Sequence, residues 1–179
     1  MDKSRAAFPK VCPVNWQRRH TKNNQTITTM NKIIILKANS NTGKTTKINT
    51  IADWIITTHG AANTIGLDPA HLTKDSCGVL TVGKLNILVN SAGDDHASVL
   101  KIDAALQSFH GQVDIILCSC RTKGITYQHL YKNYNRSTGW LDVIIPIAEF
   151  TPANPTRQAA RDAALLAEIQ AWLTGLPKL

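Results

Sequence analysis

The residues best suited to chemistry form a short polar loop after an apolar run. Ile33–Leu36 are aliphatic, and the loop that follows ends in Gly43-Lys44-Thr45-Thr46. Consecutive backbone N–H groups in such a loop, closed by the start of a helix, form a concave anion site. The Lys44 ammonium would contact the β- and γ-phosphates of a nucleotide as an exposed ligand group, and the Thr45 hydroxyl would bind Mg²⁺. The predicted site comprises Ala38, Asn39, Ser40, Asn41, Thr42, Gly43, Lys44, Thr45 and Thr46.

This loop resembles the Walker A motif of the P-loop NTPases, Gly-x-x-x-x-Gly-Lys-[Ser/Thr], with alanine at the first glycine position. Ala38 gives up the positive φ that glycine adopts easily. The resemblance covers residues 32–58 by motif and the rest of the chain only by element order. It implies a P-loop NTPase fold that binds a nucleoside triphosphate with Mg²⁺. ATP is the expected nucleotide, because Arg121-Thr122-Lys123-Gly124 lacks the aspartate of the guanine-specific Asn/Thr-Lys-x-Asp pattern.

A carboxylate at a strand end is expected to support the metal. Asp94 follows the apolar run 85–89 and a glycine, and it is the first candidate, although it lies later than in the usual Walker B pattern. Asp68, which closes the predicted strand Asn63–Leu67, is the alternative. A carboxylate at position 94 could equally cap the following helix, and the sequence leaves these two roles open.

Arg121 and Lys123 follow another apolar run, Val113–Cys118. Cations at a strand end beside a phosphate site can neutralise charge in the transition state or bind an anionic second substrate. We therefore predict Lys44, Asp94, Arg121 and Lys123 as catalytic residues, with Thr45 and Asp94 at the metal. The alternative for Arg121 and Lys123 is a solvated turn.

Alternating hydrophobic patterns predict strands and helices in turn. This order predicts an α/β three-layer sandwich with a mostly parallel sheet of about five strands and a candidate antiparallel edge strand. The antiparallel strand follows from a tight turn at Gly83. The strands are expected at 32–36, 63–67, 78–82, 84–89, 113–118 and 141–147, and the helices at 44–58, 96–110, 126–134 and 156–174.

Several expectations concern burial. The continuous apolar run Leu141–Ile147 predicts a strand buried on both faces. The last helix is expected to turn Leu166, Ile169, Trp172 and Leu173 inward. The loop Pro152–Pro155, which follows the last strand, is expected to lie on the adenine side of the nucleotide. Cys118 and Cys120 lie two apart on a predicted strand, which favours small buried residues over reactive thiols.

Composition separates a leading segment from the body. Of 20 Lys and Arg residues in the chain, six lie within residues 1–30, which contain one acid, Asp2. We expect residues 1–30 to be a basic, poorly ordered arm and residues 31–179 to be a P-loop NTPase domain. A solvated extension is favoured over nucleic-acid binding, because the arm has no nucleic-acid-binding motif. No apolar stretch is long enough for a membrane span and no secretory signal is evident, so the expected compartment is the cytoplasm.

The sequence therefore predicts an ATP-binding P-loop protein, similar in size to small kinases, that transfers or hydrolyses the γ-phosphate with Mg²⁺. Its expected partners are a nucleoside triphosphate and either a small anionic acceptor or a protein. One alternative is a nucleotide-gated switch or partner-loading NTPase. Another is a nucleic-acid-associated NTPase that uses the basic arm.

Overall fold

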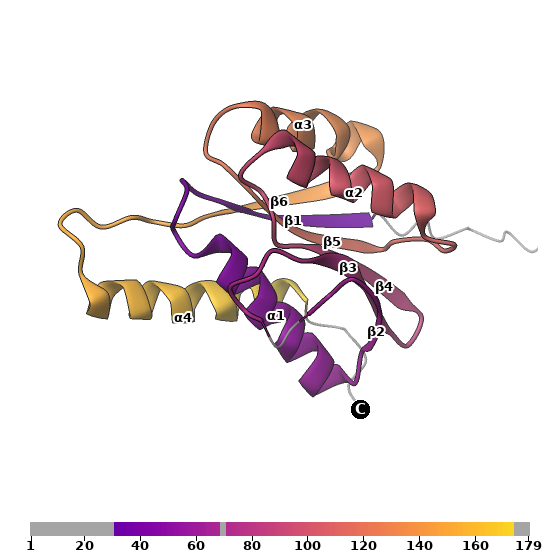
Figure 1. Cartoon of the computed structure of the whole chain (residues 1–179), viewed down its shortest axis with the longest axis horizontal. Coiled ribbons are helices and arrows are strands. Elements are labelled where there is room, and N and C mark those ends of the chain that lie inside the picture. The colour runs from indigo at the N-terminus through magenta and orange to yellow at the C-terminus, as the bar shows by residue number, and fades with distance from the viewer. Residues whose placement is uncertain (1–30, 69–70, 174–179) are drawn as a thin grey trace, which may run out of the picture.

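A computed structural model describes residues 31–68 and 71–173 of the chain. Within these ranges, one six-stranded sheet lies between two pairs of helices (Figure 1). Helices α1 (Lys44–His59) and α4 (Pro155–Trp172) cover one face, and α2 (His96–Ser108) and α3 (Ile125–Asn133) cover the other. The predicted three-layer α/β arrangement is confirmed. The predicted arm, residues 1–30, lies outside the described residues.

The predicted strands are present with bounds shifted by one or two residues. They are β1 (Asn31–Lys37), β2 (Ala62–Ile65), β3 (Cys77–Val82), β4 (Leu85–Asn90), β5 (Ile115–Cys120) and β6 (Trp140–Pro146). A short 3-10 turn, η1 (Arg136–Thr138), precedes β6. Because β5 ends at Cys120, two residues later than predicted, the strand leads directly into Arg121.

The order of strands in the sheet is β2-β3-β4-β5-β1-β6. β3 pairs antiparallel with both of its neighbours, and the other pairings are parallel. The antiparallel pairing of β3 with β4 follows from the tight turn at Gly83, whose φ is 60°. The antiparallel strand is not at the edge of the sheet, however, because β2 adds outside it.

One edge of the sheet gathers the ends of several strands. Lys37 at the end of β1 is in register with Cys120 at the end of β5, and Asn90 at the end of β4 is in register with Cys118. Because β3 runs the opposite way, its first residue, Cys77, is the one that pairs with Asn90. The start of β3 therefore lies at the edge where the parallel strands end. Ligands of open α/β sheets bind beyond this edge.

The apolar stripe of α1 packs as its spacing predicts. Ile48, Ile51 and Ile55 are fully buried against the sheet, and Gly60 ends the helix in a left-handed conformation. On the other face, Val99 and Ile102 of α2 lie in a second core with apolar side chains of β1, β4 and β5. These two cores hold the loops at the carboxyl edge in place.

Of two burial predictions, one is confirmed in part and the other is wrong. In α4, Ile169 and Leu173 are buried as expected, and Leu166 is partly buried against the same core. Leu165 is buried as well, whereas Trp172 is 39% exposed. β6 is mostly half-buried, because it lies at the edge of the sheet and no strand within residues 31–68 and 71–173 pairs with its outer side. None of the helices within the described ranges is long and apolar enough to cross a membrane.

Candidate functional site

The loop between β1 and α1 has the backbone of an anion site. Asn41 and Gly43 both have positive φ, 62° and 77°, on either side of Thr42. Left-handed residues in such an arrangement turn successive N–H groups toward one side of the loop. Gly43 is the N-cap of α1 and supplies no side-chain acceptor, which leaves the first N–H groups of the helix available to a ligand. Glycine suits this position because L residues with a side chain rarely adopt a φ of 77°.

Alanine is compatible with the first position of the loop. Among the described residues, Asn41 is the one non-glycine residue with positive φ, so Ala38 has ordinary backbone geometry. Ala38 is fully buried in the core below α1, and its N–H donates to Cys120 O at 3.2 Å. The departure from the usual motif is therefore accommodated by a loop that does not need glycine at position 38.

Lys44 lies at the centre of the site, but it is buried, and the prediction that it is exposed was wrong. Its side chain is 4% exposed. Lys44 Nζ donates to Asn39 O at 2.6 Å and lies 2.9 Å from Asp94 Oδ1. A buried ammonium ion requires such partners, because desolvation without them would be costly. Asp94 is 50% exposed, so the ion pair opens toward solvent on the carboxylate side.

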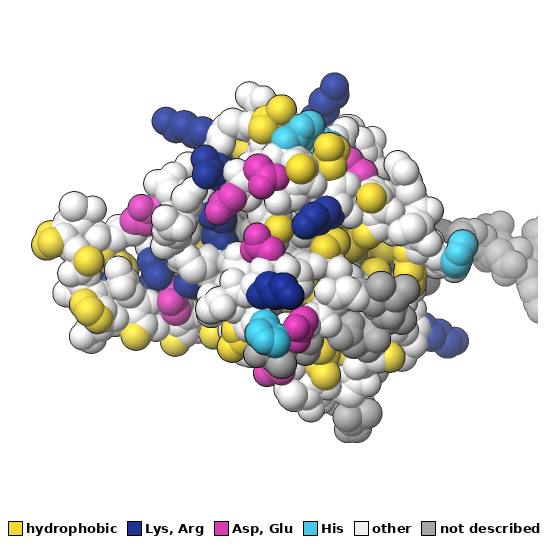
Figure 2. All heavy atoms as spheres, in the orientation of Figure 1, with side chains coloured by type: hydrophobic (Ala, Val, Ile, Leu, Met, Phe, Trp, Pro, Cys, Tyr) yellow, Lys and Arg dark blue, Asp and Glu magenta, His cyan; other side chains and the backbone are white. Residues whose placement is uncertain are grey.

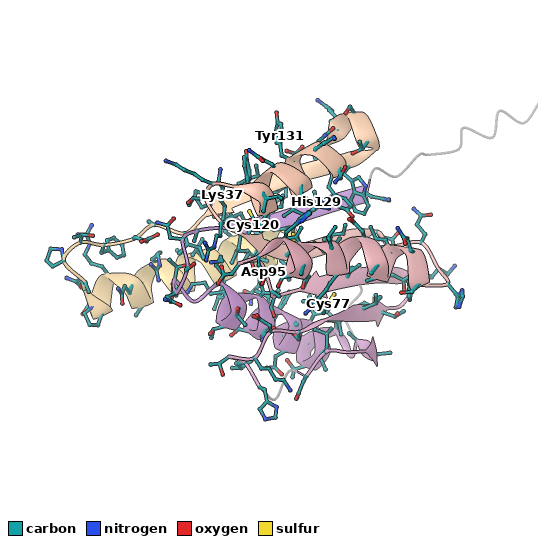
Figure 3. All side chains as sticks on the ribbon, turned by 45° about the horizontal axis from the view of Figure 1, so that its top comes forward. Lys37, Cys77, Asp95, Cys120, His129 and Tyr131 are labelled. Atoms are coloured by element: carbon teal, nitrogen blue, oxygen red, sulfur yellow. The ribbon has the colours of Figure 1, made fainter. Side chains whose placement is uncertain are left out.

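The role of helix cap belongs to Asp95. Its carboxylate accepts from Ser98 N at 2.7 Å, and this hydrogen bond to the backbone lowers the pKa of Asp95 below its ordinary value. Asp94 takes no part in the cap and points to Lys44, with Arg121 Nε 3.8 Å from the same carboxylate oxygen. In Figure 3, Asp95 lies at the start of α2. The sequence left open whether Asp94 caps α2 or faces Lys44, and in the structure Asp95 caps the helix while Asp94 pairs with Lys44.

Tight packing beneath the site sets the position of Asp94. A Cβ on Gly93 would lie 2.1 Å from Ser119 O, so the chain passes β5 too closely for any side chain. Ser119 Oγ donates to Ser91 O at 2.9 Å, which ties the end of β5 to the same turn. The glycine that precedes Asp94 therefore permits the approach that brings the carboxylate to Lys44.

The structure adds Asp75, which sequence reasoning missed. Thr45 Oγ1 donates to Asp75 Oδ1 at 2.8 Å and also approaches Ser91 O at 3.4 Å. Asp75 precedes β3. Because β3 runs antiparallel to β4, Asp75 lies at the edge of the sheet where the parallel strands end. The turn at Gly83 was the signal that could have found it, since that turn places the start of β3 at the carboxyl edge.

A network of buried polar groups fixes the loop that carries Asp75. Asn49 on α1 donates to Leu72 O at 2.9 Å and to Lys74 O at 2.8 Å, and accepts from Ser76 Oγ at 3.0 Å. Ser76 N donates to Ser91 Oγ at 2.8 Å, which links this loop to the turn after β4. Helix α1, which follows the loop after β1, thus also positions the carboxylate of Asp75.

Asp68, the alternative metal residue, is engaged elsewhere. Its carboxylate lies 2.7 Å from His71 Nδ1, three residues later. Within the described residues, no hydrogen bond or ion pair joins Asp68 to Lys44 or Thr45. Asp75 and Asp94 are therefore the carboxylates at the site.

Two cavities adjoin the loop between β1 and α1 and share residues Asn41 and Gly43. One, of about 330 Å³, is also lined by Lys44, Thr45 and Asp94. The other, of about 420 Å³, lies between the loop and the segment from β6 into α4, and its walls include Lys47, Glu149, Phe150, Gln158, Arg161 and Asp162. Pro152–Pro155, predicted as the adenine-side loop, is not part of this lining, but the residues immediately before it are.

The loop after β5 directly contacts the loop between β1 and α1. Thr122 Oγ1 donates to Asn39 Oδ1 at 2.6 Å, and Arg121 approaches Asp94. Lys123 is exposed in the same loop, and the part of the chain that the structure describes gives it no ion pair. The structure therefore brings Arg121 to the site and leaves Lys123 at its rim.

The cysteines of β5 are packing residues. Cys118 and Cys120 are fully buried in the core on the α2 and α3 side, and Cys120 is labelled in Figure 3. Burial raises the pKa of Cys120 to about 11 against the opposing effect of Lys37 and Lys44, and burial raises the pKa of Cys118 as well. Both thiols are thus neutral at physiological pH and poor nucleophiles.

The donor atoms near Thr45 are hydroxyl and carboxylate oxygens, the type that Mg²⁺ prefers. Among the described residues, no group of three or more His, Cys, Asp or Glu side chains forms a metal-binding cluster.

Comparison with protein-family models, curated proteins and solved structures gives no significant match.

Proposed function

We propose that this chain is an ATP-binding P-loop protein that performs Mg²⁺-dependent phosphoryl transfer or ATP hydrolysis and is similar in plan to small kinases. The observation that carries the proposal is the environment of Lys44. Its ammonium is buried under a loop of left-handed residues at the start of α1, beside a polar cavity, and pairs with a carboxylate that is half exposed. A polyphosphate is a natural alternative partner for that ammonium.

In this proposal, the N–H groups of the loop and of the first turn of α1 hold the phosphates. Lys44 turns from Asp94 toward them, because a polyphosphate carries more negative charge than one carboxylate. The short distance between Lys44 Nζ and Asn39 O keeps the ammonium at the mouth of the loop during this exchange. The chain thus supplies a fixed anion site and one mobile charge partner.

The residues around Thr45 fit a magnesium ion. The Thr45 hydroxyl would be a ligand, Asp75 would orient that hydroxyl, and Asp94 would hold the ion directly or through water once Lys44 has turned away. Bound Mg²⁺ neutralises charge that develops on the transferring phosphoryl group. Magnesium sites in such proteins use one or two carboxylates together with phosphate oxygens, which this donor set can supply.

The larger cavity accounts for the rest of the nucleotide. It begins at the same loop and extends toward Phe150 and α4. Its polar and charged walls suit a ribose and the edge of an adenine better than an apolar ligand. We therefore place the nucleoside between the loop and the segment before Pro152, in a cavity of about 420 Å³.

Arg121 and Lys123 would act on the reacting side. Arg121 already approaches Asp94 and so lies beside the position assigned to the γ-phosphate. Charge at this point is most useful when negative charge shifts during transfer. Lys123, at the rim, is placed to attract an anionic acceptor.

The deciding experiment replaces Lys44 with methionine, which fills a similar volume without charge. ATP affinity measured by calorimetry with Mg²⁺ should fall to an undetectable level in a folded Lys44→Met protein. Lys84→Met, an exposed residue at the β3–β4 turn, is the matched control and should bind normally. Normal ATP affinity in Lys44→Met would refute the proposal. Turnover with and without candidate acceptors then separates transfer from hydrolysis.

A further inference from the structure

The segment that includes α3 has an unusual charge distribution. From residue 115 to residue 141 the chain contains no Asp or Glu, while Arg121, Lys123, Lys132 and Arg136 are all present and exposed. Three of these, Lys123, Lys132 and Arg136, form no ion pair with any described residue. In Figure 2, Lys and Arg side chains project from the part of the surface where Figure 1 places α3. This surface therefore has positive charge that the fold does not neutralise.

Aromatic rings lie among these cations. Tyr127 and Tyr131, one turn apart on α3, stack with ring centroids 5.9 Å apart and planes inclined by 29°. Tyr131 is 58% exposed, and Figure 3 shows it projecting from the outer side of α3. Lys37 Nζ lies 3.6 Å from the centroid of the Tyr127 ring. The inner side of the helix is occupied by Leu130, which is buried, so the fold does not require the outer tyrosine.

We propose that this surface, formed by Lys37, Lys123, Tyr127, Tyr131, Lys132 and Arg136, binds single-stranded nucleic acid. The exposed ring of Tyr131, supported by the partly buried Tyr127, is suited to stack on an unpaired base, and the cations around it are suited to contact the phosphodiester backbone. Charge complementarity favours this ligand, because the surface has several unpaired cations and no acid from its own segment. The surface shares Lys123 with the rim of the proposed site of phosphoryl transfer, but the proposal does not depend on ATP binding.

The surface nevertheless adjoins the phosphate loop. Lys37 is the last residue of β1, immediately before that loop, and Thr122 in the loop before α3 donates to Asn39. A single-stranded nucleic acid bound along α3 would therefore end beside the loop between β1 and α1. The basic arm, residues 1–30, is a different part of the chain, and the experiment must distinguish the two.

The test measures binding of fluorescent 12-nucleotide oligo-U and oligo-dT by anisotropy with the full chain over a series of salt concentrations. Tyr131→Ala should weaken binding about 5- to 100-fold through lost stacking, and Tyr131→Phe should retain it. The double variant Lys132→Ala/Arg136→Ala should reduce the slope of log affinity against log salt by about 1.4. Lys84→Ala/Lys101→Ala removes two exposed cations elsewhere and should change neither quantity. The two oligonucleotides show whether RNA or DNA is preferred.

Several results would overturn the proposal. One is the absence of measurable binding to either oligonucleotide. Another is full affinity in Tyr131→Ala together with a loss in Arg18→Ala/Arg19→Ala, which would assign binding to the arm. Competition by polyglutamate as strong as by unlabelled oligonucleotide would indicate an acidic protein partner instead. The melting temperature of Tyr131→Ala is measured alongside, and an unchanged value shows that a loss of binding does not come from a damaged fold.

Discussion

The substitution Asp94→Asn tests how the site exchanges one negative partner for another. In the structure, Asp94 Oδ1 lies 2.9 Å from the buried Lys44 ammonium, where the phosphates of the proposed nucleotide would bind. Under the proposed function, the carboxylate would compete with the nucleotide when Mg²⁺ is absent and would support the metal when it is present. Asparagine has nearly the same shape without the charge. The two roles predict opposite effects of one substitution.

The magnitude follows from the distance and the exposure. Two unit charges 2.9 Å apart attract by about 6 kcal/mol at an effective dielectric constant of about 20, and by about 1.4 kcal/mol in water. Because Asp94 is half exposed, its attraction to Lys44 lies nearer the lower value. We take about 1.4 to 2.8 kcal/mol, which corresponds to about 10- to 100-fold in affinity. In EDTA, ATP should bind Asp94→Asn more tightly by this factor.

With Mg²⁺ the order should reverse, and turnover of Asp94→Asn should fall by about 10-fold or more because a metal carboxylate is lost. Calorimetry in EDTA and a turnover assay with Mg²⁺ measure the two effects. Asp95→Asn is the matched control, since it removes the same charge one residue away and asparagine caps a helix as well as aspartate does. Weaker ATP binding in EDTA, or equal effects of the two substitutions, would refute the reasoning.

Three further predictions concern the groups around the site. Gly93→Ala should lower the free energy of unfolding by about 1–3 kcal/mol in denaturant titrations, because its Cβ would overlap Ser119 O and force the two loops apart; an unchanged midpoint would contradict the close approach. Asp95→Ala should lower the melting temperature. Since the pKa of Asp95 is lowered in the folded state, the difference from the wild type should be full above about pH 5 and should shrink as the pH falls below the ordinary carboxyl value; a difference that grows with acid would be the wrong sign. Cys118 and Cys120 should resist iodoacetamide at pH 8 in the native protein and react after unfolding, as read by peptide mass spectrometry, because burial raises the pKa of both thiols; rapid native labelling of either residue would contradict their burial.

Contiguous features could be predicted from the sequence. The apolar run of β1, the polar loop and the isoleucine stripe of α1 lie within one stretch of about 30 residues, and each depends on local spacing. The structure places Lys44 and Thr45 at the start of α1 as that spacing predicts. The alternation of strands and helices also predicted the layers, because each amphipathic element must bury one face against a neighbour.

Other features depend on which elements are neighbours. β6 has an apolar sequence like that of a central strand, yet among the strands of the described residues it lies at the edge. Trp172 was expected to be buried together with Ile169 and Leu173, but the face of α4 that meets the core includes Leu165 and leaves Trp172 partly in solvent. Hydrophobicity alone does not distinguish these arrangements, because each residue could be buried by a different neighbour.

The loop between β1 and α1 is thus determined by the sequence itself, whereas the carboxylates that come near it are decided by the tertiary structure. Asp75 lies 30 residues after Thr45, and it comes into contact only because β3 runs antiparallel and Asn49 binds the loop before it. Asp94 and Asp95 are adjacent and chemically identical, yet one pairs with Lys44 and the other caps α2. The physical reason is that an anion site is built from consecutive backbone N–H groups, whereas a charge pair depends on the distance between side chains that only the folded sheet brings together.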